Sequence, residues 1–121
     1  MQRNFSVSQK SFDSFYNLLN LDETRTELRE NFEKFALDEC RQHAESMDKT
    51  DVFPKEIWRK MGDMGLLGIT VEEKYGGMGL GYFEHCMAVE EISKVNAAMA
   101  LSYLAHSNLC VNQIRLNGTE E

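Results

Sequence analysis

Two pairs of residues with metal-binding side chains occur at helical spacing in this sequence. Cys40 and His43 lie three residues apart, and His106 and Cys110 lie four apart, so each pair can share one face of a helix. A structural zinc site needs four ligands, and a catalytic zinc site needs at least three from the protein. Because each pair supplies two ligands and cysteine is commonly buried, we interpret both pairs as packing residues and predict no metal site.

Glu90 and Glu91 are adjacent carboxylates, the next pattern that could do chemistry. Neighbours on a helix point about 100° apart, so these two cannot share a proton as a catalytic dyad does. The glycines of residues 76–81 follow the pattern G-G-x-G-x-G, whereas a dinucleotide-binding turn has G-x-G-x-x-G directly between a strand and a helix. We therefore predict a connecting loop at 76–81 and no catalytic residue.

Helices must position these side chains, because apolar residues repeat at helical spacing along most of the chain. Leu28, Phe32, Phe35 and Ala36 follow one another at i, i+4, i+7 and i+8, which predicts an amphipathic helix at about 22–45.

A short second helix is expected after Pro54, because its fixed φ suits the first helical position. The expected apolar face of this helix consists of Ile57, Trp58, Met61 and Met64. Gly65 is placed to end the helix in the left-handed conformation. Residues 66–71 are a short apolar run, for which we expect an extended or irregular conformation.

Two more helices are predicted, at about 82–94 and from Ala97 to about residue 116. One face of the first is expected to hold Phe83, Met87, Ile92 and Val95. Asn96 can cap the last helix, whose apolar residues are spread around the whole circumference. The earlier helices can cover only part of that surface, so we expect more chain, a second subunit or an apolar ligand to cover the rest. The fold class is all-α.

Composition limits the classes of partner. The chain has 121 residues, 42% of them hydrophobic and 27% charged, as expected for one soluble domain. A net charge of −7, with 13 Lys and Arg that form no stripe, argues against nucleic acid. No apolar run reaches the roughly 20 residues needed to span a bilayer, so we expect no membrane insertion. Three cysteines without C-x-x-C spacing suggest free thiols in a reducing compartment, each buried or uncharged.

The two ends differ from the middle. Residues 1–20 are expected to be a short arm or a mitochondrial presequence, because the first twelve residues hold basic, serine and phenylalanine residues and no acid. Residues 21–121 are expected to be the folded domain. Asn117 and Gly118 suit a helix C-terminus, and residues 119–121 look like the cap and first turn of a further helix. The domain is therefore expected to be incomplete at its C-terminal end.

Several segments carry a resemblance to a known family. The first group comprises 53–58 (FPKEIW), 64–71 (MGLLGITV) and 75–80 (YGGMGL), which resemble the opening of acyl-CoA dehydrogenases. The second group comprises 81–85 (GYFEH), 87–93 (MAVEEIS), 101–103 (LSY) and 105–113 (AHSNLCVNQ). These segments resemble the isovaleryl-CoA branch of that family. The resemblance covers about residues 21–120.

The resemblance implies a helical N-terminal domain, followed in complete members by a β domain and a helical bundle, and usually a homo-oligomer. It implies FAD as cofactor, an acyl-CoA substrate in leucine catabolism, electron-transfer flavoprotein as partner and a mitochondrial matrix location. The catalytic glutamate and the flavin-contacting segments of the family lie beyond these residues, so the chain alone is expected to bind no flavin and to be inactive.

By the family pattern, Leu101 and Ala105 match positions that face the acyl chain of the substrate, and they share a helical face at i and i+4. The alternative for both is that they are ordinary core residues. Leu104 departs from the family pattern, which has glycine there, and its larger side chain would narrow the pocket or repack the helix. The rival to the enzyme hypothesis is a non-catalytic helical module that self-associates or binds acyl chains.

Overall fold

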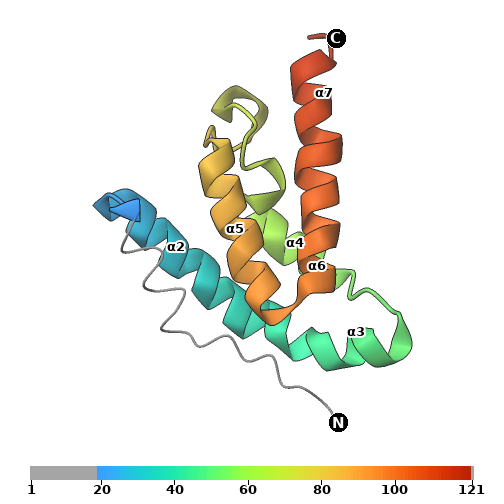
Figure 1. Cartoon of the computed structure of the whole chain (residues 1–121). Coiled ribbons are helices and arrows are strands. Elements are labelled where there is room, and N and C mark those ends of the chain that lie inside the picture. The colour runs from blue at the N-terminus through green and yellow to red at the C-terminus, as the bar shows by residue number, and fades with distance from the viewer. Residues whose placement is uncertain (1–18, 121) are drawn as a thin grey trace.

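The computed structural model describes residues 19–120, so most of the arm predicted at 1–20 lies outside the described part. Within residues 19–120 all regular structure is helical and there is no strand, which confirms the all-α fold class. No helix in this range is both long enough and apolar enough to cross a membrane. Helix α5 (Tyr82–Val95) packs against α2 (Glu23–Phe35) on one side and α6 (Ala97–Leu104) on the other. The end of α7 (Asn112–Asn117) projects away from the other helices (Figure 1).

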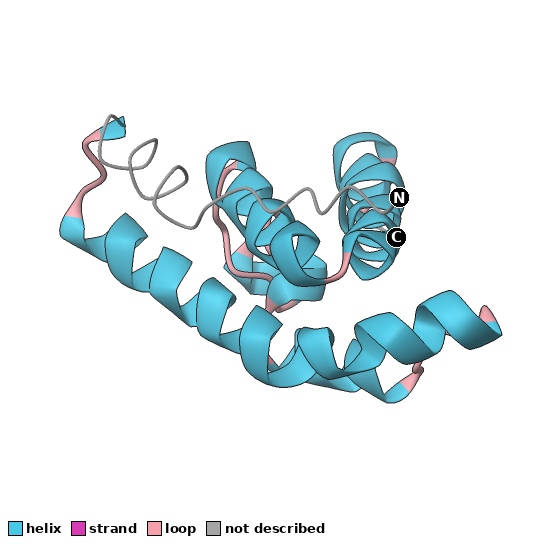
Figure 2. Cartoon of the chain, turned by 60° about the horizontal axis from the view of Figure 1, so that its bottom comes forward, coloured by secondary structure: helices cyan, strands magenta, loops and turns pink. Residues whose placement is uncertain are grey.

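The predicted first helix is confirmed, but it is longer and less regular than expected. It consists of α2 (Glu23–Phe35), a π-helix (Ala36–Cys40), a 3-10 turn (Arg41–His43) and α3 (Ala44–Thr50). Figure 2 shows these pieces as one long, bent helical segment below the other helices. Asp22 caps α2 by accepting the backbone N–H of Arg25 at 2.8 Å. The buried stripe of this helical segment consists of Phe32, Phe35, Ala36 and Cys40.

Helix α4 (Glu56–Asp63) is the predicted short helix. Its side chains Ile57 and Met61 are buried, whereas Trp58 and Met64 are half-buried. Gly65 follows with φ of +75°, which confirms the left-handed cap. A Cβ at this glycine would lie 2.7 Å from the sulfur of Met78, so a larger residue here would also displace the Met78 side chain.

Residues 66–81 form a folded-back loop, and its first part, 66–71, is irregular, which was one of the two conformations expected there. Two 3-10 turns (Leu66–Gly68 and Glu73–Tyr75) are followed by the glycine-rich stretch, which confirms the predicted loop. Residues 78–80 are hydrogen-bonded back to residues 68–71. The N–H of Gly79 donates to the carbonyl of Val71 at 2.7 Å, and the N–H of Leu80 donates to the carbonyl of Ile69 at 3.0 Å.

The predicted buried face of helix α5 (Tyr82–Val95) is confirmed only in part. Met87 and Ile92 are buried as expected, but Phe83 is 40% exposed. The remaining buried side chains of α5 are Glu84, His85, Ala88 and Glu91. The prediction was wrong because it counted apolar residues only, and charged side chains can be buried where partners from other elements meet them.

The last helix consists of α6 (Ala97–Leu104), a π-helix (Ala105–Val111), called here the π segment, and α7 (Asn112–Asn117). The Asn96 side chain caps it by accepting the N–H of Met99 at 3.0 Å, as predicted. Gly118 ends α7 with φ of −76°, so the end of this helix is extended and needs no left-handed glycine.

Candidate functional site

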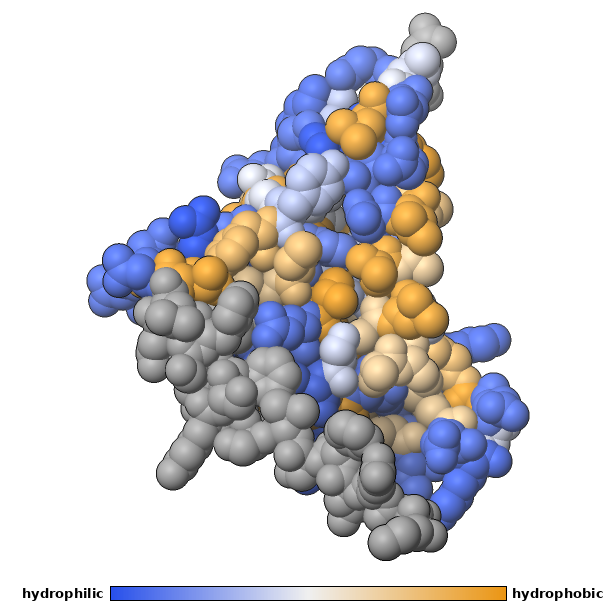
Figure 3. Space-filling model, in the orientation of Figure 1, coloured by the Kyte–Doolittle hydropathy of each residue, from blue (hydrophilic) through white to orange (hydrophobic). Residues whose placement is uncertain are grey.

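The outer side of the last helix is apolar and exposed. Leu101 is 66% and Leu109 is 67% exposed, and Ala105 between them is also exposed. We call these three residues, spaced at i, i+4 and i+8, the exposed row. Ile114 and Leu116 add exposed apolar surface beyond it, and Figure 3 shows hydrophobic side chains gathered along this helix. The expectation that the chain covers only part of this helix is confirmed.

Leu101 and Ala105, the predicted acyl-contacting residues, therefore lie together on the solvent side of this chain. Neither residue is buried among residues 19–120, so this domain by itself does not cover them. Leu104, the departure from the family pattern, is half-buried beside the row. That Leu101 and Ala105 contact an acyl chain stays a prediction.

The inner side of the same helix is a line of buried residues: Met99, Tyr103, Ser107 and Asn112. The Ser107 hydroxyl donates to the carbonyl of Tyr103 at 2.9 Å and lies 2.6 Å from Nε2 of His85. The ring of His85 also packs on that of Tyr103, with 5.4 Å between centroids. Burial lowers the pKa of His85.

Asn112 links three parts of the chain behind the row. Its amide nitrogen donates to the hydroxyl of Tyr82 at 2.9 Å, and its oxygen accepts from Nε of Arg115 at 3.1 Å and from the hydroxyl of Thr70 at 3.4 Å. The 66–81 loop, the start of α5 and the start of α7 are thereby tied to one buried amide.

Two buried glutamates of α5 are held by basic residues. Glu91 is 1% exposed, lies 2.8 Å from Nζ of Lys94 and is 3.6 Å from Arg29. Burial outweighs these ion pairs and raises the pKa of Glu91. Burial alone would also raise the pKa of Glu84, but the Arg25 guanidinium at 2.8 Å and two backbone N–H groups lower it. Both carboxylates are therefore engaged by structural partners.

The cysteine and histidine pairs do not form a metal centre in residues 19–120, where no three potential ligands come together. Cys40 is buried, and burial raises the pKa of its thiol to about 12. His106 packs against the ring of Trp58 at 5.4 Å. The packing interpretation is confirmed for these two residues, but it is wrong for Cys110, which is exposed, as is Cys86.

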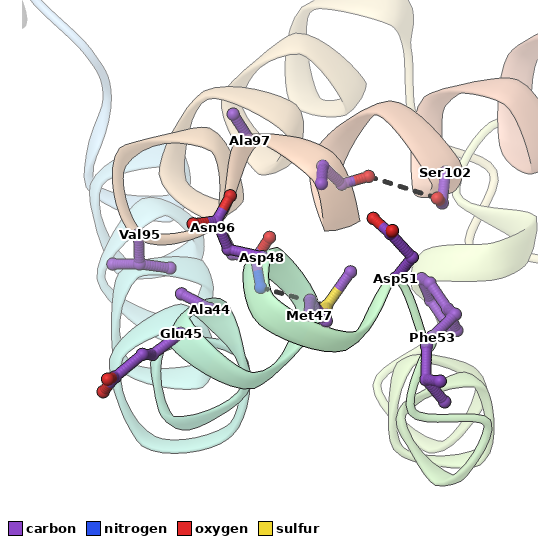
Figure 4. Close-up of a pocket in the computed structure, with 12 residues that line it drawn as sticks. Ala44, Glu45, Met47, Asp48, Asp51, Phe53, Val95, Asn96, Ala97 and Ser102 are labelled. Carbon is purple, nitrogen blue, oxygen red and sulfur yellow. Dashed lines mark hydrogen bonds between the residues drawn. The ribbon is translucent and has the colours of Figure 1, made fainter.

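A hollow of about 690 Å³ lies between α3 and the start of α6 (Figure 4). Its wall combines apolar side chains with the carboxylates of Glu45, Asp48 and Asp51. Asn96 faces it but is already bonded, with its amide nitrogen 3.4 Å from the sulfur of Met47. Because neither residue predicted to contact the acyl chain lines the hollow, it is separate from the exposed row.

Sequence reasoning missed the buried polar residues behind the row, above all His85, Ser107 and Asn112. Ser107 and Asn112 are five residues apart, a spacing that does not repeat on one face of a regular helix. Helical periodicity therefore did not predict that both would be buried. The family segments that contain them, 81–85 and 105–113, were the one signal that marked these positions.

Comparison with known proteins agrees with the earlier resemblance. The family model "Acyl-CoA dehydrogenase, N-terminal domain" matches residues 22–121. Isovaleryl-CoA dehydrogenase, mitochondrial, of Arabidopsis thaliana is 50% identical over 92% of this chain and 28% of the relative. The mitochondrial 2-methylacyl-CoA dehydrogenase of Solanum tuberosum is 45% identical over 98% of this chain and 29% of the relative.

A solved structure gives the same result for the fold. It is described as "Electron transferring flavoprotein of Acidaminococcus fermentans: Towards a mechanism of flavin-based electron bifurcation", and one of its chains superimposes with a TM-score of 0.77 at 34% identity. The match covers 83% of this chain and 26% of that one. The sequence thus spans less than a third of the length of the proteins it matches. On this evidence the chain belongs to the acyl-CoA dehydrogenase family, as its helical N-terminal domain.

Proposed function

We propose that these residues are the N-terminal part of a flavin-dependent dehydrogenase of the isovaleryl-CoA type, which forms the α,β double bond of a short branched acyl-CoA in leucine catabolism. Leu101 and Ala105 form one wall of its acyl pocket. The proposed location is the mitochondrial matrix, consistent with the mitochondrial relatives. The proposed partners are electron-transfer flavoprotein and further copies of the enzyme.

The observation that carries this proposal is the exposed apolar row on the outer side of the last helix, opposite the buried inner side of the same helix. From Ala97 to Ile114 the helix contains no Lys, Arg, Asp or Glu, although the chain as a whole has a net charge of −7. A branched acyl group is apolar, and burying each of its CH₂ groups is worth about 0.8 kcal/mol. An uncharged row with a leucine at each end and an alanine in the middle provides a shallow apolar wall for such a group.

Among the described residues, the glycine-rich loop of 76–81 does not fit the pyrophosphate of FAD. The glycine-rich loop is the candidate for binding a pyrophosphate, but backbone bonds back to Gly68, Ile69 and Val71 already occupy its N–H groups at Met78, Leu80 and Gly79. Bound elsewhere in the complete enzyme, the flavin would accept the hydride. The contribution of this domain is to position the acyl chain and to exclude water from it.

The proposal is tested with the complete protein that contains these residues. We expect oxidation of isovaleryl-CoA with an artificial electron acceptor, and we expect Leu101→Phe to lower kcat/KM for that substrate at least tenfold by filling the wall. Ile114→Phe is the matched control, because Ile114 is equally exposed, at 66%, but lies outside the row. The proposal fails if no acyl-CoA is oxidised, a result that would favour the non-catalytic module, or if both variants act alike.

A further inference from the structure

The inner line of the last helix could not face inward on a regular α-helix. Met99 and Asn112 are thirteen residues apart, and at about 100° per residue Asn112 would point about 220° away from Met99. Both residues are nevertheless no more than 2% exposed. The π segment resolves this discrepancy, because its wider turns rotate each residue by less than an α-helix does.

The same segment aligns the exposed row. In an α-helix an interval of four residues advances about 40°, so Leu109 would lie about 80° around the helix from Leu101. Instead the two leucines are equally exposed, at 66% and 67%, on either side of Ala105. The amide N–H of Asn112 bonds to the carbonyl of Ser107, five residues earlier, which is the bond that defines the wider turn.

His85 and Ser107 meet at the middle of the π segment. Ser107 has a single hydroxyl hydrogen, and it donates this hydrogen to the carbonyl of Tyr103. In the tautomer with its hydrogen on Nε2, His85 then donates the 2.6 Å bond to the oxygen of Ser107. Both side chains are at most 3% exposed, so water does not replace either bond.

This pair joins α5 to the turn that separates Ala105 from Leu109. A serine that bonds to the carbonyl four residues earlier often bends a helix, and here Ser107 also has a second partner on another helix. Ser107 lies two residues from each of Ala105 and Leu109, on the opposite side of the helix. Holding Ser107 inward therefore holds both of them outward.

We propose that His85 and Ser107 are positioning residues. Their hydrogen bond maintains the π segment and so aligns the side chains of the exposed row along the acyl chain. The proposal rests on the proposed function for its consequence, the selection between branched and straight acyl groups. Without the bond, the segment can return to α-helical turns, which rotates Leu109 away from the line of Leu101.

Four variants test the positioning role. Ser107→Ala and His85→Leu remove the bond, whereas His85→Gln retains an N–H donor at the position of Nε2. Ser102→Ala is the matched control, because Ser102 makes the same kind of bond, to the carbonyl of Ala98 at 3.1 Å, outside the π segment. The His85 variants leave the Ser107 hydroxyl in place, so they test the proposal even if Ser107→Ala fails to fold.

The first readout is amide hydrogen exchange of the 121-residue chain, followed by mass spectrometry of peptides that cover residues 105–112. We expect at least tenfold faster exchange in this segment for Ser107→Ala and His85→Leu, and wild-type exchange for His85→Gln and Ser102→Ala. Equal exchange in His85→Gln and His85→Leu would show that ring packing, not the bond, holds the segment. Unchanged exchange in both bond-removing variants would also overturn the proposal.

The second readout is the ratio of kcat/KM for isovaleryl-CoA to that for a straight-chain acyl-CoA in the complete protein. We expect this ratio to fall at least fivefold in the two bond-removing variants, through KM, while kcat for the better substrate changes less than twofold. A ratio that stays constant while exchange rises refutes the link to selectivity. If the wild-type protein oxidises no acyl-CoA, the proposed function fails, and the exchange experiment alone still decides whether the pair holds the π segment.

Discussion

Gly77→Ala is expected to be the most damaging small substitution in the 66–81 loop. A Cβ at Gly77 would lie 2.1 Å from the carbonyl oxygen of Val71 and 2.5 Å from its carbonyl carbon, both of them backbone atoms. A side-chain rotation cannot relieve such a clash. The returning part of the loop must therefore move away from the outgoing part.

The magnitude follows from the hydrogen bonds that this movement breaks. The N–H groups of residues 78, 79 and 80 donate to the carbonyls of residues 68, 71 and 69 at 3.1, 2.7 and 3.0 Å. Each bond contributes about 0.5–1.5 kcal/mol net, so losing all three lowers the free energy of unfolding by about 3 kcal/mol. This is a large part of the roughly 5–15 kcal/mol that stabilises a domain.

Gly76→Ala provides the matched control. Gly76 has φ of +83°, but a Cβ there would meet no atom within 4 Å. The cost is the strain of a left-handed alanine, about 1–2 kcal/mol. Urea denaturation followed by circular dichroism, at one protein concentration, measures both variants. Equal stability of the two alanine variants would refute the claim that backbone contact at Gly77 determines the loop.

Four further predictions follow from burial and exposure. Iodoacetamide at neutral pH should alkylate Cys86 and Cys110 in the folded chain but not Cys40, whose pKa burial raises to about 12. Burial lowers the pKa of His85, so below about pH 6.5 the unfolded chain binds more protons at this residue than the folded chain does. The free energy of unfolding should therefore fall as the pH drops below about 6.5, and His85→Gln should reduce this pH dependence. The isolated chain should self-associate through the exposed row in light scattering, and Leu109→Glu should reduce the association. The purified chain should show no stoichiometric flavin absorbance.

Each of these has a contradicting result. Alkylation of Cys40 at the rate of the exposed thiols would mean that the helical segment of residues 23–50 opens readily. The same pH dependence of stability in the wild type and in His85→Gln between pH 5 and 7 would show that folding does not lower the pKa of His85. A monodisperse monomer with a strong near-UV circular dichroism signal would show that the chain covers its own apolar surface, and a yellow protein would show that these residues suffice to bind flavin.

The sequence alone determined where the helices lie and how several of them begin and end. Apolar spacing predicted the helices, because a residue buried on one face of a helix must recur every three or four positions. Local chemistry predicted the cap at Asn96, the left-handed Gly65 and the loop at 76–81, because these depend on neighbours in the chain.

Only the tertiary structure decided the buried face of α5. Glu84 and Glu91 are buried because Arg25, 59 residues away, and Arg29 reach them from α2, together with the nearby Lys94. A pattern of polar and apolar letters assigns such glutamates to the solvent side, since it contains no information about distant partners. For the same reason it placed Phe83 in the core, where the structure leaves it 40% exposed.

The tertiary structure also decided which side of the last helix faces solvent. Its apolar residues surround the helix, so no stripe in the sequence distinguishes Tyr103 from Leu101, yet one is 0% and the other 66% exposed. The choice depends on contacts with α5 and on the wider turns of the π segment. Helical periodicity assumes a constant turn, and the π segment departs from it.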